Sequence, residues 1–243
     1  MEIALHVLFG ATVGYIIVSV CESFFHNVMG HPPPRFRIAC KSAGILGCWV
    51  RRAWYSHGVV HHLSTFRINF VTQFKDDAEE RKLREKMIRT NRGHVVSQEY
   101  GLRVGPFSEQ LRYVAPTLPF MFVACLMGLP WFPMGALLPL IIMPLVSQFI
   151  HPLIHMRYDD AVAEAGPLLR LIVKSRYFRY VARHHWLHHQ DPGVNFNLIP
   201  IGDLLLGRYC SPNGEDIVAM ARDGLFVADH KLYCLKLPSR IAH

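Results

Sequence analysis

The fold is decided by residues 3–31, which read IALHVLFGATVGYIIVSVCESFFHNVMGH. Residues 3–25 are almost continuously apolar, interrupted mainly by His6, Ser19 and Glu22. A helix needs about 20 such residues to cross the hydrocarbon core of a bilayer. We favour a retained span over a cleaved signal peptide, because no basic residue precedes the run and no small-residue cleavage site follows it. This stretch therefore predicts a membrane helix with a pair of histidines at its end.

The composition of the whole chain supports a membrane protein. Of 243 residues, 51% are hydrophobic and only 18% are charged, whereas soluble domains carry about 25% charged residues. The length suits one unit, residues 1–243. The formal net charge is +8, which we assign to loops beside an anionic membrane, because no nucleic-acid motif or basic aromatic stripe is found. The six cysteines form no C-x-x-C pair and are expected to be reduced thiols.

Two further spans are predicted at residues 113–129 and 134–150, joined by a Pro-Trp-Phe-Pro turn. The segment 38–55 contains three basic residues and only a short apolar core, so it is predicted to be an interfacial or re-entrant helix, with a fourth span as the alternative. The expected fold is an all-α membrane bundle of three to four spans. A helical cap, residues 56–112 and 151–243, is placed in the cytoplasm by the positive-inside rule.

Residues 74–92 are densely charged, with opposite charges three or four residues apart. This pattern predicts a solvated helix that connects parts of the cap. A docking face for an electron donor is the alternative interpretation.

Histidine is strongly enriched, with 15 residues, most of them in four groups. The groups have the spacings H-x4-H, H-x3-HH, H-x3-H and H-x2-HH, and they begin at His26, His57, His151 and His185. Residues three or four apart share one helical face, so two imidazoles can hold one metal ion. An adjacent pair points its rings in different directions and can serve two ions. Ten buried neutral imidazoles without a common purpose would be costly, so we predict a shared metal site.

The order of these groups resembles the fatty acid hydroxylase / sterol desaturase superfamily of membrane di-iron enzymes. The tail supports the resemblance, because Asn195-Phe196-Asn197 and then Gly202-Asp203-Leu204-Leu205-Leu206-Gly207 are similar to the closing N-Y-G and W-D-x-x-F-G pattern. Phe196 and Asn197 depart from that pattern. The resemblance covers about residues 15–210. It implies these metal ligands: His26, His31, His57, His61, His62, His151, His155, His185, His188 and His189.

Several other residues lie near the groups and have weaker roles. The candidates for holding a ligand imidazole by its other N–H are Glu22, His184, Asp191 and Asn195. Glu22, one turn before His26, is the best of these, and a snorkelling interface acid is the alternative. Asn195 could instead cap a turn. The remaining histidines, His6, His94, His230 and His243, are interpreted as structural or solvated.

The resemblance implies an O2-dependent monooxygenase that hydroxylates an aliphatic C–H bond of a fatty acyl, sterol or other lipid-like substrate. It implies two Fe ions, which Zn can replace, O2 as co-substrate, and electrons from an external NAD(P)H-dependent reductase or small redox carrier. The expected partners are the lipid bilayer, the substrate and that electron-transfer protein, without nucleic acid. The location would be the bacterial inner membrane or the endoplasmic reticulum, with the metal site facing the cytoplasm.

Three alternatives stay open at this point. A desaturase would act on the same substrates. A membrane metal-binding or transport protein would place ionisable groups near the bilayer midplane, whereas these histidines flank span ends. A zinc hydrolase would need three ligands, a water and often H-E-x-x-H, which is absent from the chain.

Overall fold

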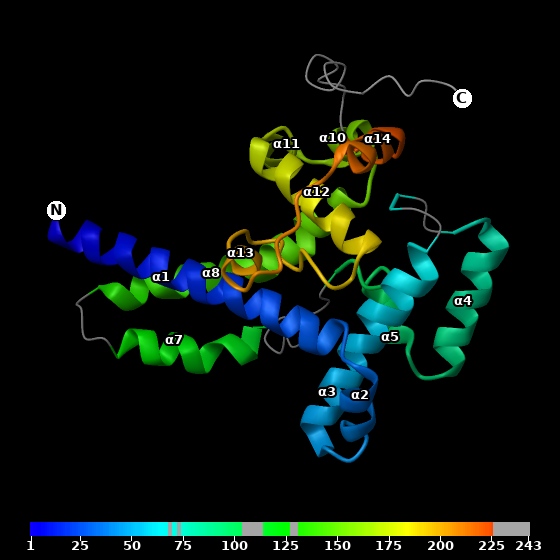
Figure 1. Cartoon of the computed structure of the whole chain (residues 1–243), viewed down its shortest axis with the longest axis horizontal. Helices are drawn as coiled ribbons and strands as arrows, with labels where there is room; N and C mark the ends of the chain where they lie inside the picture. The colour runs from blue at the N-terminus through cyan, green and yellow to red at the C-terminus, as the bar shows by residue number, and fades with distance from the viewer. Residues whose placement is uncertain (68–69, 72–73, 104–113, 127–130, 226–243) are drawn as a thin grey trace, which may run out of the picture.

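The computed structural model describes residues 1–67, 70–71, 74–103, 114–126 and 131–225. Within these ranges the chain is all-helical, as predicted, and it contains no strand. Two long helical segments lie side by side, and shorter helices gather at one end of the pair (Figure 1). This arrangement places a long apolar part next to a compact polar cap.

Two helices are long and apolar enough to cross a membrane. The first, residues Glu2–Gly30, consists of α1 (Glu2–Phe25) and the π-helix η1 (His26–Gly30). The second, residues Phe132–Ile154, consists of α8 (Phe132–Leu145), the π-helix η4 (Val146–Ile150) and α9 (His151–Ile154). Both expose large apolar side chains on their outer faces, for example Leu8 at 64% and Ile141 at 60%. Contiguous exposed apolar surface of this kind fits contact with lipid.

The predicted span at residues 113–129 is only partly described. The described part contains the 3-10 helix η3 (Ala115–Thr117) and α7 (Leu118–Cys125), which lies beside α8 (Figure 1). Residue 113 and residues 127–129 lie outside the described ranges. With eight residues, the described helix is shorter than a bilayer requires. A third span therefore stays a prediction.

The segment predicted to be re-entrant forms two short helices rather than one span. They are α2 (Pro34–Ala39) and α3 (Gly44–Trp54), and although α3 continues directly into the next helical segment, that stretch is not among the described helices that are long and apolar enough to cross a membrane. Pro34 occupies the first turn of α2, where its missing N–H costs nothing. The chain turns back here, because α3 continues into the π-helix η2 (Tyr55–Thr65), which contacts η1. The first two histidine groups are thereby brought together.

The cap is built from short helices around a central one. It contains α4 (Asp77–Arg89), α5 (Gly93–Ser97), α10 (Tyr158–Glu164), α11 (Pro167–Val173), α12 (Arg176–Gln190) and α14 (Gly214–Arg222). Helix α4 is the charged helix expected from the sequence, and the Asp76 side chain caps it by accepting from the Glu79 N–H at 2.9 Å. Helix α12 buries Phe178, Val181 and Trp186 in the main apolar core, which fixes the orientation of the histidines it carries.

The tail after α12 returns to the first span. Its short helix α13 (Gly202–Leu205) lies against α1. Ser19 Oγ donates to the Ile199 carbonyl at 2.5 Å and accepts from the Gly202 N–H at 2.7 Å. Three polar residues of α1, Ser19, Glu22 and Ser23, are thus buried against the tail. This contact explains how polar side chains are accommodated in an otherwise apolar helix.

Helices α1 and α8 approach so closely that only glycine fits at the crossing. A Cβ on Gly14 would lie 2.4 Å from the Ala136 carbonyl oxygen. We predict that Gly14→Ala lowers the free energy of unfolding by about 1–3 kcal/mol, because the two backbones must separate. Thermal unfolding of the purified protein in detergent measures the change. Gly93→Ala is the matched control, since a Cβ there meets nothing within 4 Å, and an equal loss in both variants would contradict the crossing.

Candidate metal centre

Three of the four histidine groups lie on or directly after π-helical turns. His26 begins η1, the group at His57 lies within η2, and His151 directly follows η4. On an α-helix, residues five apart are separated by about 140° around the axis. The wider π-helical turn pairs residue i with i+5, and such turns are frequent at functional sites. This local widening brings His26 and His31 to one face, stacked at 5.7 Å between ring centroids.

Five imidazoles form one group, here named cluster A: His26, His31, His57, His62 and His188. The Nε2 atoms of His26 and His57 are 2.7 Å apart, and those of His57 and His62 are 3.1 Å apart. The Nε2 atoms of His31 and His188 are 3.2 Å apart. Potential ligand atoms of four members, His26, His31, His57 and His188, lie within 4.8 Å of one another.

The other five imidazoles form cluster B: His61, His151, His155, His185 and His189. His185 Nε2 lies 3.0 Å from Nε2 of both His151 and His155. The Nε2 atoms of His61 and His189 are 3.1 Å apart. The structure therefore gathers all ten histidines implied by the resemblance into two adjoining clusters. Neighbouring members of one helix serve different clusters, as with His61 and His62.

The opposite ring nitrogens show which atoms are available for a metal. In four of the rings, Nδ1 lies 2.7–2.9 Å from a backbone carbonyl. The pairs are His26 with Phe196, His151 with Leu102, His155 with Phe70, and His188 with Val194. A carbonyl can only accept, so these Nδ1 atoms carry the proton and donate. The Nε2 atoms of the same rings then present lone pairs. Metal-binding histidines are commonly oriented in this way, by an N–H donated to a carbonyl.

The residues of cluster B fit a bound metal ion better than they fit a hydrogen-bond network. His185 Nε2 is 3.0 Å from two lone pairs, those of His151 and His155, and it carries at most one proton. At least one of the two contacts therefore brings lone pairs together without a proton between them. Within the two clusters, the buried Nδ1 atoms of His61 and His185 also have no partner among the described residues. A cation among the Nε2 atoms removes the repulsion, and imidazole is a suitable ligand for Fe, Zn, Cu or Ni.

Burial keeps the imidazoles of clusters A and B neutral, which metal binding requires. It lowers the pKa of His31 to about 3, and repulsion from His26 adds to the effect. Desolvation also holds the pKa of His61, His185 and His189 well below the ordinary range, with further lowering from neighbouring imidazoles. At neutral pH each of these rings therefore carries one proton and keeps one nitrogen lone pair for a metal ion.

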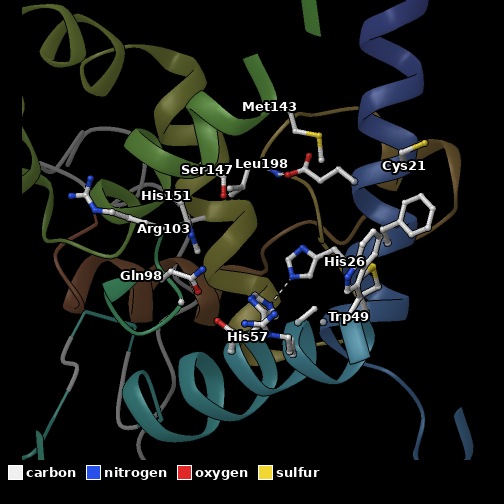
Figure 2. Close-up of a pocket in the computed structure, with 18 of the residues that line it drawn as sticks. Cys21, His26, Trp49, His57, Gln98, Arg103, Met143, Ser147, His151 and Leu198 are labelled. Carbon is white, nitrogen blue, oxygen red and sulfur yellow. Dashed lines mark hydrogen bonds between the residues drawn. The ribbon is translucent and has the colours of Figure 1, made fainter. Parts of the chain in front are cut away.

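A cavity of about 240 Å³ opens onto both clusters. Its floor contains His26 and His57 of cluster A and His151 and His185 of cluster B. Figure 2 shows the His26 and His57 rings facing each other and His151 approaching from another element. The walls come from α1, α3, α8 and the segment after α5. A molecule in this cavity would touch ligands of both clusters.

Glu22 was expected to hold a ligand imidazole directly, and it contacts the tail instead. It does not hold the ring of His26, whose Nδ1 is taken by the Phe196 carbonyl. Its carboxylate accepts from the Leu198 N–H at 3.1 Å and from the Ile199 N–H at 2.9 Å. Glu22 thus fixes the tail segment, and that segment in turn orients His26.

His184 lies outside both clusters, with its ring directed to Asp203. Its Nε2 is 2.8 Å from the Asp203 carboxylate, which also accepts from Ser23 Oγ at 2.6 Å and the Asn197 N–H at 2.7 Å. The Asp203 carboxylate therefore joins α12, the tail and α1. This role follows from the tertiary return of the tail, which the sequence spacing did not reveal.

The other two candidates are structural in this arrangement. Asn195 has a positive φ of 55° and exchanges hydrogen bonds with the backbone of Cys210 at 2.8 and 3.0 Å. It shapes a turn, which was one of its two expected roles. Asp191 is exposed and accepts from the Gly193 N–H at 2.8 Å, which closes the turn after α12.

Among the remaining histidines, which were interpreted as structural or solvated, His94 lies on α5 and lines the cavity. Gln98, Gly101 and Arg103 of the same segment also line the cavity, and no motif marked them. His6 lies in the first half of α1, outside both clusters. His230 and His243 lie outside the described residues.

Comparison with known proteins identified no relative. No family model, no curated protein and no solved structure matches this chain.

Acidification is expected to destabilise the metal-free protein. Histidines of the unfolded chain take up protons near their ordinary pKa of about 6.5, whereas the cage histidines outside the two long helices have much lower values in the folded state. Above about pH 6.5 these histidines are neutral in both states and the free energy of unfolding does not depend on their protonation. Below that pH the free energy of unfolding falls by up to about 1.4 kcal/mol per pH unit for each such histidine, because only the unfolded chain binds the proton.

Chemical denaturation of chelator-treated protein at about pH 7.5, 6 and 5 measures this slope. A free energy of unfolding that stays constant over this range would contradict the burial of neutral imidazoles.

Proposed function

We propose that this chain is a membrane di-iron oxygenase that hydroxylates an aliphatic C–H bond of a lipid-like substrate. The observation that carries the proposal is the convergence of ten histidines into two five-membered clusters that share one cavity. The geometry supports two metal ions. The choice of iron, and of O2 as co-substrate, rests on the resemblance to the fatty acid hydroxylase / sterol desaturase superfamily.

The chain's own residues define what the centre can do. Cluster A and cluster B would each hold one ion through Nε2 atoms, while backbone carbonyls fix four of the rings by their Nδ1 protons. The bound iron would supply the oxidising power that an unactivated C–H bond requires. Cys21, Phe25, Met143 and Leu198 give the cavity an apolar wall, which would bind a hydrocarbon chain and exclude water from the reacting carbon.

Electrons must come from outside the chain in this proposal, from an NAD(P)H-dependent reductase or a small redox carrier. The placement of the clusters where the two long helices end agrees with a centre at a membrane surface, and we assign that surface to the cytoplasm on the distribution of Lys and Arg. Desaturation of the same substrate class is the alternative outcome, since the same site could remove a second hydrogen.

Metal content tests the centre directly. We predict about two metal ions per chain, and His61→Ala is expected to lower that count and abolish turnover, because His61 belongs to cluster B and adjoins cluster A. Elemental analysis of the purified protein gives the count. His6→Ala is the matched control, since it removes an imidazole outside both clusters. A wild-type count near one, or activity retained in His61→Ala, would contradict the assignment.

Lipid analysis tests the reaction. In cells that express the chain, we predict a lipid class whose mass increases by one oxygen and which is absent from cells that express His61→Ala. Loss of two hydrogens instead would identify a desaturase. An unchanged lipid profile with altered metal uptake would contradict both and favour a transport protein.

A further inference from the structure

We propose that the cavity binds a single-chain amphiphile with an anionic head group, and that Arg52 recognises that head group. This inference rests on the proposed function for its reaction, but it concerns binding and can be tested without turnover. It also places the attacked carbon near the polar end of the substrate.

The cavity wall is divided into an apolar and a polar side. The more apolar side comes from the two long helices and the tail, with Cys21, Phe25, Met143 and Leu198, and it also includes Glu22 and Ser147. Figure 2 shows Met143 and Leu198 on the side of the cavity away from Trp49 and His57. The polar side comes from α3, the start of η2 and the segment after α5, with Arg52, Ser56 and Gln98. A ligand with a hydrocarbon tail and a polar head matches this division.

The charges on the polar side favour an anion. Arg52 is exposed and makes no hydrogen bond or ion pair with any described residue. Arg103 also lines the cavity, but its guanidinium is paired with the Glu99 carboxylate at 2.6 Å. Arg52 is therefore the cation that remains available to a ligand.

The one carboxylate in the described cavity lining, that of Glu22, is engaged by other groups. Both oxygens of Glu22 accept hydrogen bonds from the tail, from the Leu198 and Ile199 N–H groups and from Asn197 Nδ2 at 3.2 Å. A guanidinium binds a carboxylate or phosphate through charge-assisted hydrogen bonds of higher strength than neutral ones. The cavity thus offers one available cation and no competing free acid among its described lining.

The spacing along the helix sets the position of the head group relative to the cage. Arg52 and His57 lie on one continuous helical segment, α3 followed by η2. Five residues correspond to roughly 7 Å along a helix axis at about 1.5 Å per residue. A head group at Arg52 therefore leaves only a few carbons between itself and cluster A. The attacked position should be near the head rather than at the end of the chain.

Trp49 provides the measurement, because it lines the same cavity one helical turn before Arg52. Bromine quenches tryptophan fluorescence on contact, so bromine-labelled carboxylate, alcohol and trimethylammonium amphiphiles of equal chain length can be titrated into the metal-loaded protein. We expect the carboxylate to quench at about tenfold lower concentration than the alcohol, since hydrogen bonds between charged groups are stronger than neutral ones. Trp49→Phe should remove the quenching component.

Variants of Arg52 separate head-group recognition from general attraction to the surface. Arg52→Gln should abolish the preference for the carboxylate, and Arg52→Lys should retain part of it. Arg51→Gln is the matched control, because Arg51 is an exposed neighbour on α3 that does not line the cavity. An alkyl phosphate of the same length distinguishes the kind of anion, and preference for either anion over the alcohol supports the proposal.

Equal quenching by all three head groups in the wild type would overturn the proposal. An equal effect of Arg51→Gln and Arg52→Gln would also overturn it, since it would show only attraction to an interfacial helix. If the carboxylate binds through Arg52 but no lipid is oxidised, the head-group site stands and the proposed function fails. If a lipid is oxidised but the protein shows no head-group preference, the proposed function stands and the head-group site fails.

Discussion

The structure depends on the mutual approach of imidazole lone pairs in a buried space. Nε2 atoms from separate helices meet at about 3 Å, and carbonyl contacts on the opposite side of four rings fix the proton there. Without a cation, such contacts repel, and the burial of so many polar rings is costly. With two cations, as proposed, the same contacts would hold η1, η2, α9 and α12 together. The proposed metal centre would then join the long helices to the cap.

Two side-chain carboxyl groups, those of Glu22 and Asp203, hold the tail against α1 beside the clusters. Glu22 binds the backbone of residues 198–199, and Asp203 binds His184, Ser23 and the Asn197 N–H. Neither carboxylate contacts a cluster histidine through these bonds. Both position the tail segment whose Phe196 carbonyl orients His26. A buried polar side chain whose oxygens are hydrogen-bonded favours this arrangement, since displacement would leave polar groups without partners.

The sequence predicted the members of the site better than its geometry. The ten histidines were identifiable because their spacing is regular and their number is unusual, and the two long helices because their apolar runs are long. The π-helical turns were not predictable, because helical wheels assume a period of 3.6, under which His26 and His31 diverge. Nor was the role of Glu22, since its partners at residues 197–199 lie far along the chain. His94 and Arg52 were missed because cavity walls are formed by tertiary packing, which leaves no local motif.

The anchoring of the tail on α1 has a consequence for biosynthesis. A ribosome makes α1 long before the tail, so Ser19, Glu22 and Ser23 find their partners only once residues 198–203 have been synthesised. His185, His188 and His189 also appear late in translation. Until then the three polar side chains of the nascent helix lack these partners, and the proposed metal centre could be completed only after most of these residues have been synthesised. During that interval the unfinished protein would be a natural client for insertion chaperones and quality-control proteases.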